Sequence, residues 1–380
     1  MPRIPFSSPD IGEEEIQAVV STLRSGWVTT GPETARFEEE FARRFGDEVE
    51  AIAVNSATAG LHLALEACGV GPGDEVIVPA WTFTATAEVV RYLGATPVIA
   101  DVTADSLNID IDKVLSAVTA RTRAIIPVHF AGLSVDVRAL RTALGGEISI
   151  IEDAAHALPS EKDGVAVGSC LYSDATVFSF YANKTMTTGE GGMITTRRGN
   201  LAKRARVMRL HGIDRDVFDR YSSTRPSWAY DVIAPGYKYN LTDSASAMGR
   251  VQLRRIDQMQ QRREEISNLY FDAFSSTDLT LPRRAERGEK HSWHLFVLRL
   301  PKRIERDTFI ERLSERGVGS SVHFIPLHLH SYWRSLVGVD GDAFPVSSSE
   351  FKKAVSIPLF SKMTDSQVND VISNVTELLA

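Results

Sequence analysis

The feature that most constrains the fold is a regular alternation of short strand-like runs and helical patterns between residues 50 and 200. The strand-like runs lie at 51–54, 75–78, 97–100, 124–128 and 148–151. Helical periodicity lies between them, at 59–67, 85–93, 110–118 and 135–144. The runs are nearly continuous in apolar residues, as in strands buried on both faces of a sheet. The alternation therefore predicts an α/β fold with a mainly parallel, helix-covered sheet.

Two more strand-like runs, 175–180 and 193–196, have no helical pattern between them, which indicates an antiparallel addition to the sheet. A charged helix then follows over about 245–274, a strand over 295–300 and a helix over 307–316. We therefore expect a large α/β domain over 1–244 and a smaller C-terminal α+β domain over 245–380.

The irregular stretch at 211–235 contains His, Asp, Arg, Tyr, Trp and Pro without periodicity. Loops of this length in compact domains are usually functional or form interfaces. The basic helical segment just before it carries Arg204, Arg206 and Arg209, which we expect on a solvated face.

Composition excludes several classes of protein. The 380 residues carry a formal net charge of −7, so the overall charge favours neither nucleic acid nor an anionic membrane as the main partner. No apolar run approaches the ~20 residues needed to span a bilayer, and residues 1–10 lack the apolar core of a signal peptide. The two cysteines, Cys68 and Cys170, suit a reducing compartment. We expect a cytoplasmic protein.

Lys184 is the first candidate for chemistry, because it follows an apolar strand-like run and precedes a turn rich in Gly and Thr. A lone lysine in a loop is usually a solvated surface residue. The ends of strands in α/β sheets, however, are where ligands bind. A partly desolvated amine at such a place has a lowered pKa and can react with a carbonyl group.

Asp153 ends the strand-like run at 148–151, where a carboxylate is poorly solvated and needs a cationic or hydrogen-bonding partner. One interpretation is the cap of a following helix. The other is a partner for a pyridinium nitrogen, whose protonated ring withdraws electrons from a bound amino acid.

A turn of small residues at 55–60 lies between the first strand and its helix, where free backbone N–H groups form an anion site. The glycine-rich stretch at 69–73 follows a helix, which is the wrong context for a dinucleotide fingerprint. The anion-binding turn, the carboxylate and the lysine together describe a site for a phosphorylated pyridine aldehyde.

With these features, the chain resembles the DegT/StrS-type nucleotide-sugar aminotransferases, which are pyridoxal-phosphate enzymes of the aspartate-aminotransferase fold (fold type I). The resemblance covers nearly the whole chain. Its motifs are 71–79 (GPGDEVIVP), 124–129 (AIIPVH), 152–156 (EDAAH) and 187–194 (TTGEGGMI).

The resemblance implies a role for each matching residue. Lys184 binds the cofactor aldehyde covalently and shuttles the proton, and Asp153 pairs with the pyridine nitrogen. The remaining cofactor contacts that it implies are ring stacking by Phe83, phosphate binding by the backbone of Ala57 and Thr58 and the hydroxyl of Ser179, and a contact of His156 near the phenolic oxygen. The commonest family pattern has Gln in place of His156, and one subgroup has His.

The segment 236–243 (GYKYNLTD) resembles the family stretch that reaches across a dimer interface to the neighbour's cofactor phosphate. The family residues there are Asn and Arg, where this chain has Lys238 and Asn240, and either could meet the phosphate. The resemblance thus implies a homodimer with shared active sites.

Within this family, the chain most closely resembles the subgroup with the UDP-4-amino-4-deoxy-L-arabinose aminotransferase. The resemblance lies in His156 and in the stretches 236–243, 293–296 and 317–324. This resemblance implies transfer of an amino group from an amino acid, which we expect to be L-glutamate, to a 4-keto nucleotide sugar for lipopolysaccharide or glycan biosynthesis. We expect ping-pong kinetics through Lys184. The alternatives are a sugar dehydratase, whose family members replace the lysine with His, and a non-catalytic regulator on the same fold.

Four further residues are candidates for substrate contacts. His323 and His328 lack the Cys or carboxylate spacing of a metal site, so we expect no metal. We expect them to meet substrate phosphates or the dimer partner. Trp228 and Tyr230 in the irregular stretch either stack on a nucleotide base or pack at an interface.

Overall fold

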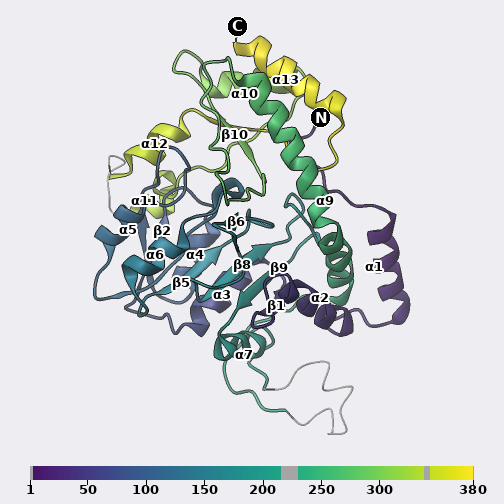
Figure 1. Ribbon diagram of the computed structural model, residues 1–380. Helices are drawn as coiled ribbons and strands as arrows, with labels where there is room; N and C mark the ends of the chain where they lie inside the picture. Colours follow the sequence, from purple (N-terminus) through teal and green to yellow (C-terminus); the bar gives the residue numbers. More distant parts are fainter. Residues whose placement is uncertain (1–2, 215–229, 338–342, 380) are drawn as a thin grey trace.

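The computed structural model describes residues 3–214, 230–337 and 343–379. Figure 1 shows a sheet-containing body, with helix α9 leading from it to the part that holds the C-terminus. The strands are β1 (Glu50–Val54), β2 (Glu75–Pro79), β3 (Thr96–Ala100), β4 (Thr122–Ile125), β5 (Ser149–Asp153), β6 (Glu161–Lys162), β7 (Val165–Ala166), β8 (Ala175–Ser179), β9 (Gly192–Thr196), β10 (Phe296–Arg299) and β11 (Ala354–Ile357).

The α-helices are α1 (Glu13–Ser25), α2 (Pro32–Arg43), α3 (Ala57–Ala67), α4 (Ala85–Tyr92), α5 (Ile111–Ala117), α6 (Val137–Leu144), α7 (Gly199–Met208), α9 (Asp243–Phe274), α10 (Arg306–Glu315), α11 (Ser331–Val337), α12 (Pro345–Phe351) and α13 (Asp365–Leu379). Two 3-10 turns lie at η1 (Phe130–Gly132) and η2 (Leu327–Leu329). The elements predicted from the sequence are present within a few residues.

The central sheet has seven strands in the order β1-β9-β8-β5-β4-β2-β3. Strands β8, β5, β4, β2 and β3 are parallel to one another, and β9 is antiparallel to both β8 and β1. The predicted antiparallel addition is therefore confirmed. Strand β9 lies between β1 and β8 in the sheet. Lys184 lies in the connection from β8 to β9.

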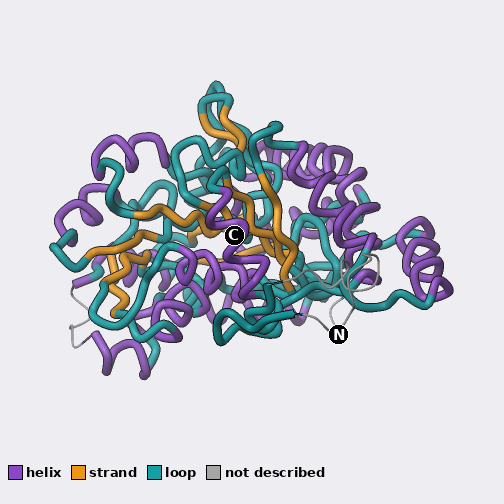
Figure 2. Tube along the Cα trace, turned by 90° about the horizontal axis from the view of Figure 1, so that it is seen from below, coloured by secondary structure: helices purple, strands orange, loops and turns teal. Residues whose placement is uncertain are grey.

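Alternate residues of each strand enter cores on opposite faces of the sheet. In β2, Val76 and Val78 pack with residues of α3 and α4, and Ile77 packs with residues of α5 and α6. Figure 2 shows the strands through the middle of the molecule with helices on both sides. Burial on both faces explains the nearly continuous apolar runs in the sequence.

Helix α3 lies close to the sheet because of Gly60. A Cβ at this position would be 2.6 Å from Cγ1 of Val177 in β8. The helix begins with Ser56, whose hydroxyl accepts a hydrogen bond of 3.1 Å from the amide of Ala59. The cap and the glycine together fix the first turn of α3 above the ends of β8 and β9.

A separate core lies in the C-terminal part. Strands β10 and β11 form an antiparallel pair, and α10, α13 and the last turns of α9 pack against it. Ile4, near the N-terminus, belongs to the same core. Helix α9 also packs against α1 and α2 in the first part of the chain. The domain boundary at 244/245 remains a prediction, because α9 contacts both parts.

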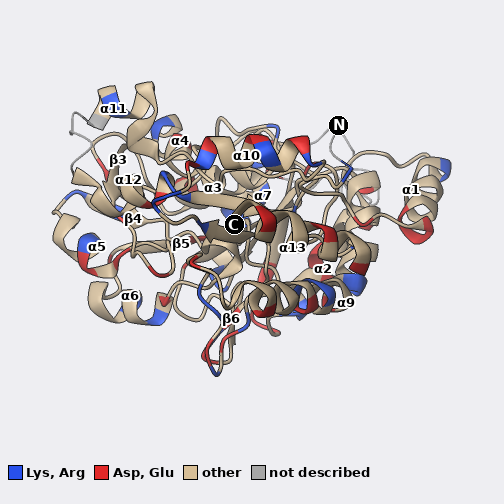
Figure 3. Cartoon of the chain, turned by 90° about the horizontal axis from the view of Figure 1, so that it is seen from above, with Lys and Arg blue, Asp and Glu red and all other residues tan. Residues whose placement is uncertain are grey.

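The charged side chains are of mixed sign. Figure 3 shows Lys and Arg interspersed with Asp and Glu along α9 and α10. The expectation of a solvated face was wrong for Arg209, which is only 5% exposed and pairs with Glu38. Among the described helices, none is long and apolar enough to cross a membrane.

Candidate active site

A cavity of about 530 Å³ opens where β5 and β8 end and α3 begins. Eight of the residues singled out in the sequence line it: Ala57, Thr58, Phe83, Asp153, His156, Ser179, Lys184 and His323. They come from segments more than 250 residues apart, yet they meet at the carboxyl edge of the parallel strands, where α/β folds bind ligands.

Asp153 ends β5 and is 6% exposed. Its Oδ2 accepts a hydrogen bond of 2.9 Å from the hydroxyl of Thr86, and its Oδ1 accepts one of 3.1 Å from the amide of Ala155. No helix begins at Asp153, so its interpretation as a helix cap was wrong. Burial raises the pKa of this carboxyl group, although Thr86, Ala155 and the charge of Lys184 oppose the shift.

Because successive side chains of a strand point to opposite faces, the Asp153 side chain lies toward the cavity and that of the preceding Glu152 lies on the other face. Glu152 accepts hydrogen bonds from His129 at 2.9 Å and from Thr176 at 2.8 Å. Because the other nitrogen of His129 accepts from the amide of Val135, we assign the ring hydrogen to Nε2, which donates to Glu152. Glu152 is therefore satisfied within the protein, and Asp153 is the carboxylate of this pair that faces a ligand.

Lys184 lies in the connection from β8 to β9, and its backbone N–H donates to the carbonyl of Tyr181 at 3.0 Å. Burial lowers the pKa of its amine to about 8, and the negative charge of Asp153 opposes this shift. At pH 7 such an amine is uncharged in about a tenth of molecules, against less than about a thousandth for an ordinary lysine. Lys184 is thus prepared to act as a nucleophile and a base.

One end of the cavity is suited to an anion. The first backbone bond of α3 runs from the amide of Gly60 to the carbonyl of Ser56, so the amides of Ala57 and Thr58 precede the bonded ladder. A Cβ on Gly192 would be 2.8 Å from the amide nitrogen of Ala57, so only glycine lets β9 pass under this turn. Ser179, at the end of β8, lines the same end.

Aromatic rings line another part of the cavity. Phe83 is 58% exposed, and its ring centroid lies 5.8 Å from that of Phe324. His156 is buried beside Phe324 at 5.7 Å in a stacked arrangement, and its Nδ1 accepts a bond of 3.3 Å from the amide of Ala131. Burial lowers the pKa of His156 well below its ordinary value, and the nearby charge of Lys184 lowers it further. This imidazole is therefore neutral at pH 7.

Lys238 and Asn240 do not line the cavity of their own chain. The Lys238 side chain is exposed, and its carbonyl accepts a bond of 3.2 Å from the side chain of Asn55. Asn240 donates at 2.6 Å to the hydroxyl of Thr30. Their assignment to a neighbour's phosphate remains a prediction.

The four candidate substrate residues have different positions. His323 lines the cavity, and burial lowers its pKa to about 4. His328 is 2% exposed, bonds to Ser348 at 2.8 Å and packs on Phe344, so the structure does not bring it to the cavity. Tyr230 is 49% exposed and does not line the cavity. Trp228 lies outside the described residues.

Thr86 and His294 are two of the site residues that sequence reasoning missed. Thr86 reaches Asp153 from α4, and His294 lines the cavity beside His156, with ring centroids 4.3 Å apart. A threonine on the buried face of a helix is common, so nothing in the sequence marked Thr86 as a residue of the site. His294 lies in the motif at 293–296, which we used as a family marker only.

The residues present fit pyridoxal phosphate. One cavity combines a reactive amine, a buried carboxylate and an anion-binding helix start, and Gly192 leaves the space that a Cβ would fill. These groups match the aldehyde, the ring nitrogen and the phosphate of that cofactor. The Lys184 amine would meet the aldehyde, and Asp153 the ring.

Comparison with known proteins agrees with this geometry. The model of the DegT/DnrJ/EryC1/StrS aminotransferase family matches residues 9–376. The spore coat polysaccharide biosynthesis protein SpsC of Bacillus subtilis is 45% identical, over 99% of this chain and 97% of its own length.

Solved structures give the same result. A protein of Streptococcus pneumoniae described as a sugar aminotransferase, in its PLP-form, is 35% identical with a TM-score of 0.89, over 99% of this chain and 100% of that chain. PseC of Helicobacter pylori, an aminotransferase involved in the biosynthesis of pseudoaminic acid, is 27% identical with a TM-score of 0.91, over 99% of both chains. Pyridoxal phosphate is therefore the expected cofactor.

Proposed function

The chain belongs to the DegT/DnrJ/EryC1/StrS aminotransferase family, and we propose that it transfers the amino group of L-glutamate to the keto carbon of a 4-keto nucleotide sugar. It is a PLP-dependent sugar aminotransferase. One observation carries the proposal: the amine of Lys184, the carboxylate of Asp153 and the start of α3 face the same cavity.

When bound, pyridoxal phosphate supplies a carbonyl carbon that accepts the amino group and a ring that withdraws electrons from the bound amino acid. Asp153 keeps the ring nitrogen protonated, since a buried carboxylate favours a cationic partner. The amides of Ala57 and Thr58 and the hydroxyl of Ser179 hold the phosphate in place. Phe83 would pack against one face of the ring, because its side chain lines the cavity and is largely exposed.

Lys184 moves the proton. With the cofactor and the amino donor bound, the lowered pKa of its amine would let it take the proton from the donor's α-carbon. The same amine returns a proton when the keto sugar is aminated. Because donor and acceptor use this cavity in turn, we expect ping-pong kinetics.

Two features support the keto sugar as acceptor and glycan biosynthesis as the setting. The relatives SpsC and PseC take part in the biosynthesis of spore coat polysaccharide and of pseudoaminic acid. The cavity of about 530 Å³ also has room for a sugar beside the cofactor. The nucleotide, the sugar and the amination at C-4 rest on the subgroup resemblance.

We further propose a homodimer in which Lys238 or Asn240 binds the cofactor phosphate of the partner. The exposure of Lys238 and its position outside its own cavity support this arrangement. A cytoplasmic location is proposed because Cys68 and Cys170 are both unpaired and buried.

The purified protein, loaded with pyridoxal phosphate, should absorb visible light, and the band should disappear when L-glutamate is added. A panel of 4-keto and 3-keto sugar nucleotides should restore the band only with the correct acceptor. Lys184→Ala should lack the band and all turnover, and Lys302→Ala, which changes an exposed lysine, should behave as wild type. A glutamate-insensitive band and no aminated product from any acceptor would overturn the proposal and favour a regulator.

A further inference from the structure

His294 is a buried residue of the cavity to which the proposed reaction gives no role. It is 4% exposed, lies just before β10 and lines the same cavity as Lys184. Its ring centroid is 4.3 Å from that of His156. Two imidazoles from segments 138 residues apart thus lie side by side in the lining of this cavity.

The backbone around this pair is held in an unfavourable conformation. Trp293 and Ala131 both adopt positive φ values, of 48° and 56°. A non-glycine residue in this region is strained and persists only where its surroundings enforce it. The amide of His294 donates to the carbonyl of Ala131 at 3.0 Å, and the amide of Ala131 donates to Nδ1 of His156. Both strained residues therefore belong to one connection that places the two rings.

Side chains of helix α9 donate hydrogen bonds to the backbone just before His294. The guanidinium of Arg263 donates to the carbonyl of Trp293 at 3.2 Å, and the side chain of Gln260 donates to the carbonyl of His291 at 2.7 Å. Arg263 is 3% exposed and has no ion pair within the described part of the chain. Burying a cation is costly unless it is hydrogen-bonded, and the carbonyl groups of Trp293 and Leu359 supply these bonds to Arg263.

The surroundings of each ring assign its tautomer. Nδ1 of His156 accepts a bond, so its hydrogen is on Nε2. Nδ1 of His294 is enclosed and has no partner among the described residues. A hydrogen there would be an unpaired buried donor, so we place it on Nε2, the ring nitrogen that is not enclosed.

Both rings are neutral at pH 7. Burial lowers the pKa of His294 well below its ordinary value, and His156, Lys184, Arg263 and His323 lower it further. A neutral imidazole donates a hydrogen bond without giving up a proton, which suits an oxygen that carries or develops negative charge.

We propose that His294 is a ligand-binding residue, whose Nε2–H donates, beside that of His156, to an anionic or carbonyl oxygen of the molecule bound in this cavity. That oxygen belongs either to the cofactor ring or to the substrate. The second case rests on the proposed function, and the first needs only cofactor binding.

The experiment compares three variants with wild type. His294→Phe keeps the ring and removes the donor, His294→Gln keeps an N–H at similar reach, and His294→Asn is too short. His328→Phe is the matched control, because it changes a buried imidazole outside the cavity. The readouts are pyridoxal phosphate affinity, the pH midpoint of the cofactor's visible band without substrate, and KM and kcat for each substrate.

If the oxygen is the cofactor's, His294→Phe should raise the pH midpoint by about one unit and weaken cofactor binding roughly ten-fold, because the oxygen loses a donor. If it is the substrate's, the spectrum stays unchanged and KM for one substrate rises roughly ten-fold. His294→Gln, which keeps an N–H donor, should stay close to wild type in both cases.

The proposal is overturned if His294→Phe matches His328→Phe in every readout. Should the Phe variant fail to fold, His294→Asn decides the matter in the same way, with wild-type behaviour again overturning it. An enzyme without turnover contradicts the proposed function and still leaves the affinity and spectral readouts to test His294.

Discussion

The hydroxyl of Thr86 donates a hydrogen bond of 2.9 Å to Oδ2 of Asp153, which joins the first turn of α4 to the end of β5. Thr82 lies 2.7 Å from the same hydroxyl oxygen, and since Thr86 donates to Asp153, Thr82 donates to Thr86. Both threonines are buried. Burial raises the pKa of Asp153, and the hydrogen bond from Thr86 at the end of this chain of hydroxyl groups opposes that rise.

We therefore expect Thr86→Val to raise the pKa of Asp153 and to lower kcat roughly ten-fold, because a charge-assisted bond contributes about 1.5–3 kcal/mol. Thr86→Ser keeps the hydroxyl and should stay near wild type. Steady-state kinetics and a titration of cofactor binding measure both variants. An unchanged kcat in the Val variant would show that Ala155 alone supports the carboxylate.

The pKa of Lys184, about 8, predicts how the apoenzyme takes up its cofactor. Only the uncharged amine attacks the aldehyde, so the rate should rise with pH and level off above about 8, not near 10.5. Stopped-flow absorbance between roughly pH 6 and 10 tests this.

Asp153→Asn should shift that profile to lower pH, since the carboxylate raises the pKa of Lys184. Asp105→Asn, at an exposed position, should leave it unchanged. A rate still rising at pH 10 in wild type would contradict the lowered pKa.

The edge strand β1 gives a stability prediction. Nη1 of Arg209 donates to the carbonyl of Ala53 at 2.9 Å, and Glu38, its ion-pair partner, accepts from the amide of Ala53 at 2.8 Å. Breaking a buried pair leaves an uncompensated charge, so Arg209→Met should lower the free energy of unfolding by about 3 kcal/mol. Arg43→Met breaks an exposed pair with Glu39 and should change it by less than about 1 kcal/mol. Urea unfolding that gives equal values for both would refute this assignment.

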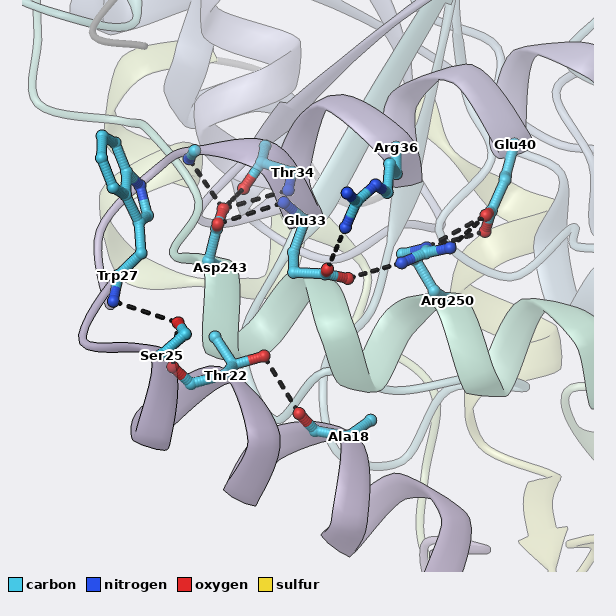
Figure 4. A network of polar contacts seen from close by, with 11 residues as sticks. Ala18, Thr22, Ser25, Trp27, Glu33, Thr34, Arg36, Glu40, Asp243 and Arg250 are labelled. Carbon is cyan, nitrogen blue, oxygen red and sulfur yellow. Dashed lines mark hydrogen bonds and ion pairs between the residues drawn. The ribbon is translucent and has the colours of Figure 1, made fainter. Parts of the chain in front are cut away.

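A second stability prediction concerns Asp243, which caps α2 from the start of α9. Figure 4 shows its carboxylate facing the first turn of α2, and the amides of Gly31, Glu33 and Thr34 donate to it at 2.7–3.1 Å. Because the carboxylate is buried and satisfies three backbone donors, Asp243→Ala should cost about 2 kcal/mol or more.

The matched control is Asp110→Ala, which removes a more exposed cap of α5 and should cost about 1 kcal/mol. Thermal unfolding of both variants, scored against wild type, compares the two caps. If the loss at Asp243 is no larger than at Asp110, water or a neighbouring group replaces the carboxylate.

The order of strands and helices could be predicted from the sequence, because burial of an element on one or both faces produces a regular pattern of apolar residues. The same local signal located Lys184 and Asp153, since Asp153 is the last residue of a buried strand and Lys184 follows the end of another by five residues. The small-residue turn before α3 was likewise visible. These are properties of segments about ten residues long, which the sequence encodes directly.

Contacts between distant segments were not readable in this way. Arg209 was expected in solvent, yet it lies against β1. His328 was expected at a substrate, yet it packs on Phe344. A histidine or arginine in the sequence looks the same whether its surroundings are water, a ligand or a strand edge. The pKa of each group depends on these surroundings.

The sequence by itself thus determined the α/β architecture, the family resemblance and the lysine and carboxylate that we propose to carry the chemistry. Only the tertiary structure decided which groups surround them: Thr86 behind Asp153, His294 beside His156, and Arg263 behind the loop that carries His294. The physical reason is that periodicity records whether a side chain is buried, whereas its partner is set by the packing of elements far apart in the chain.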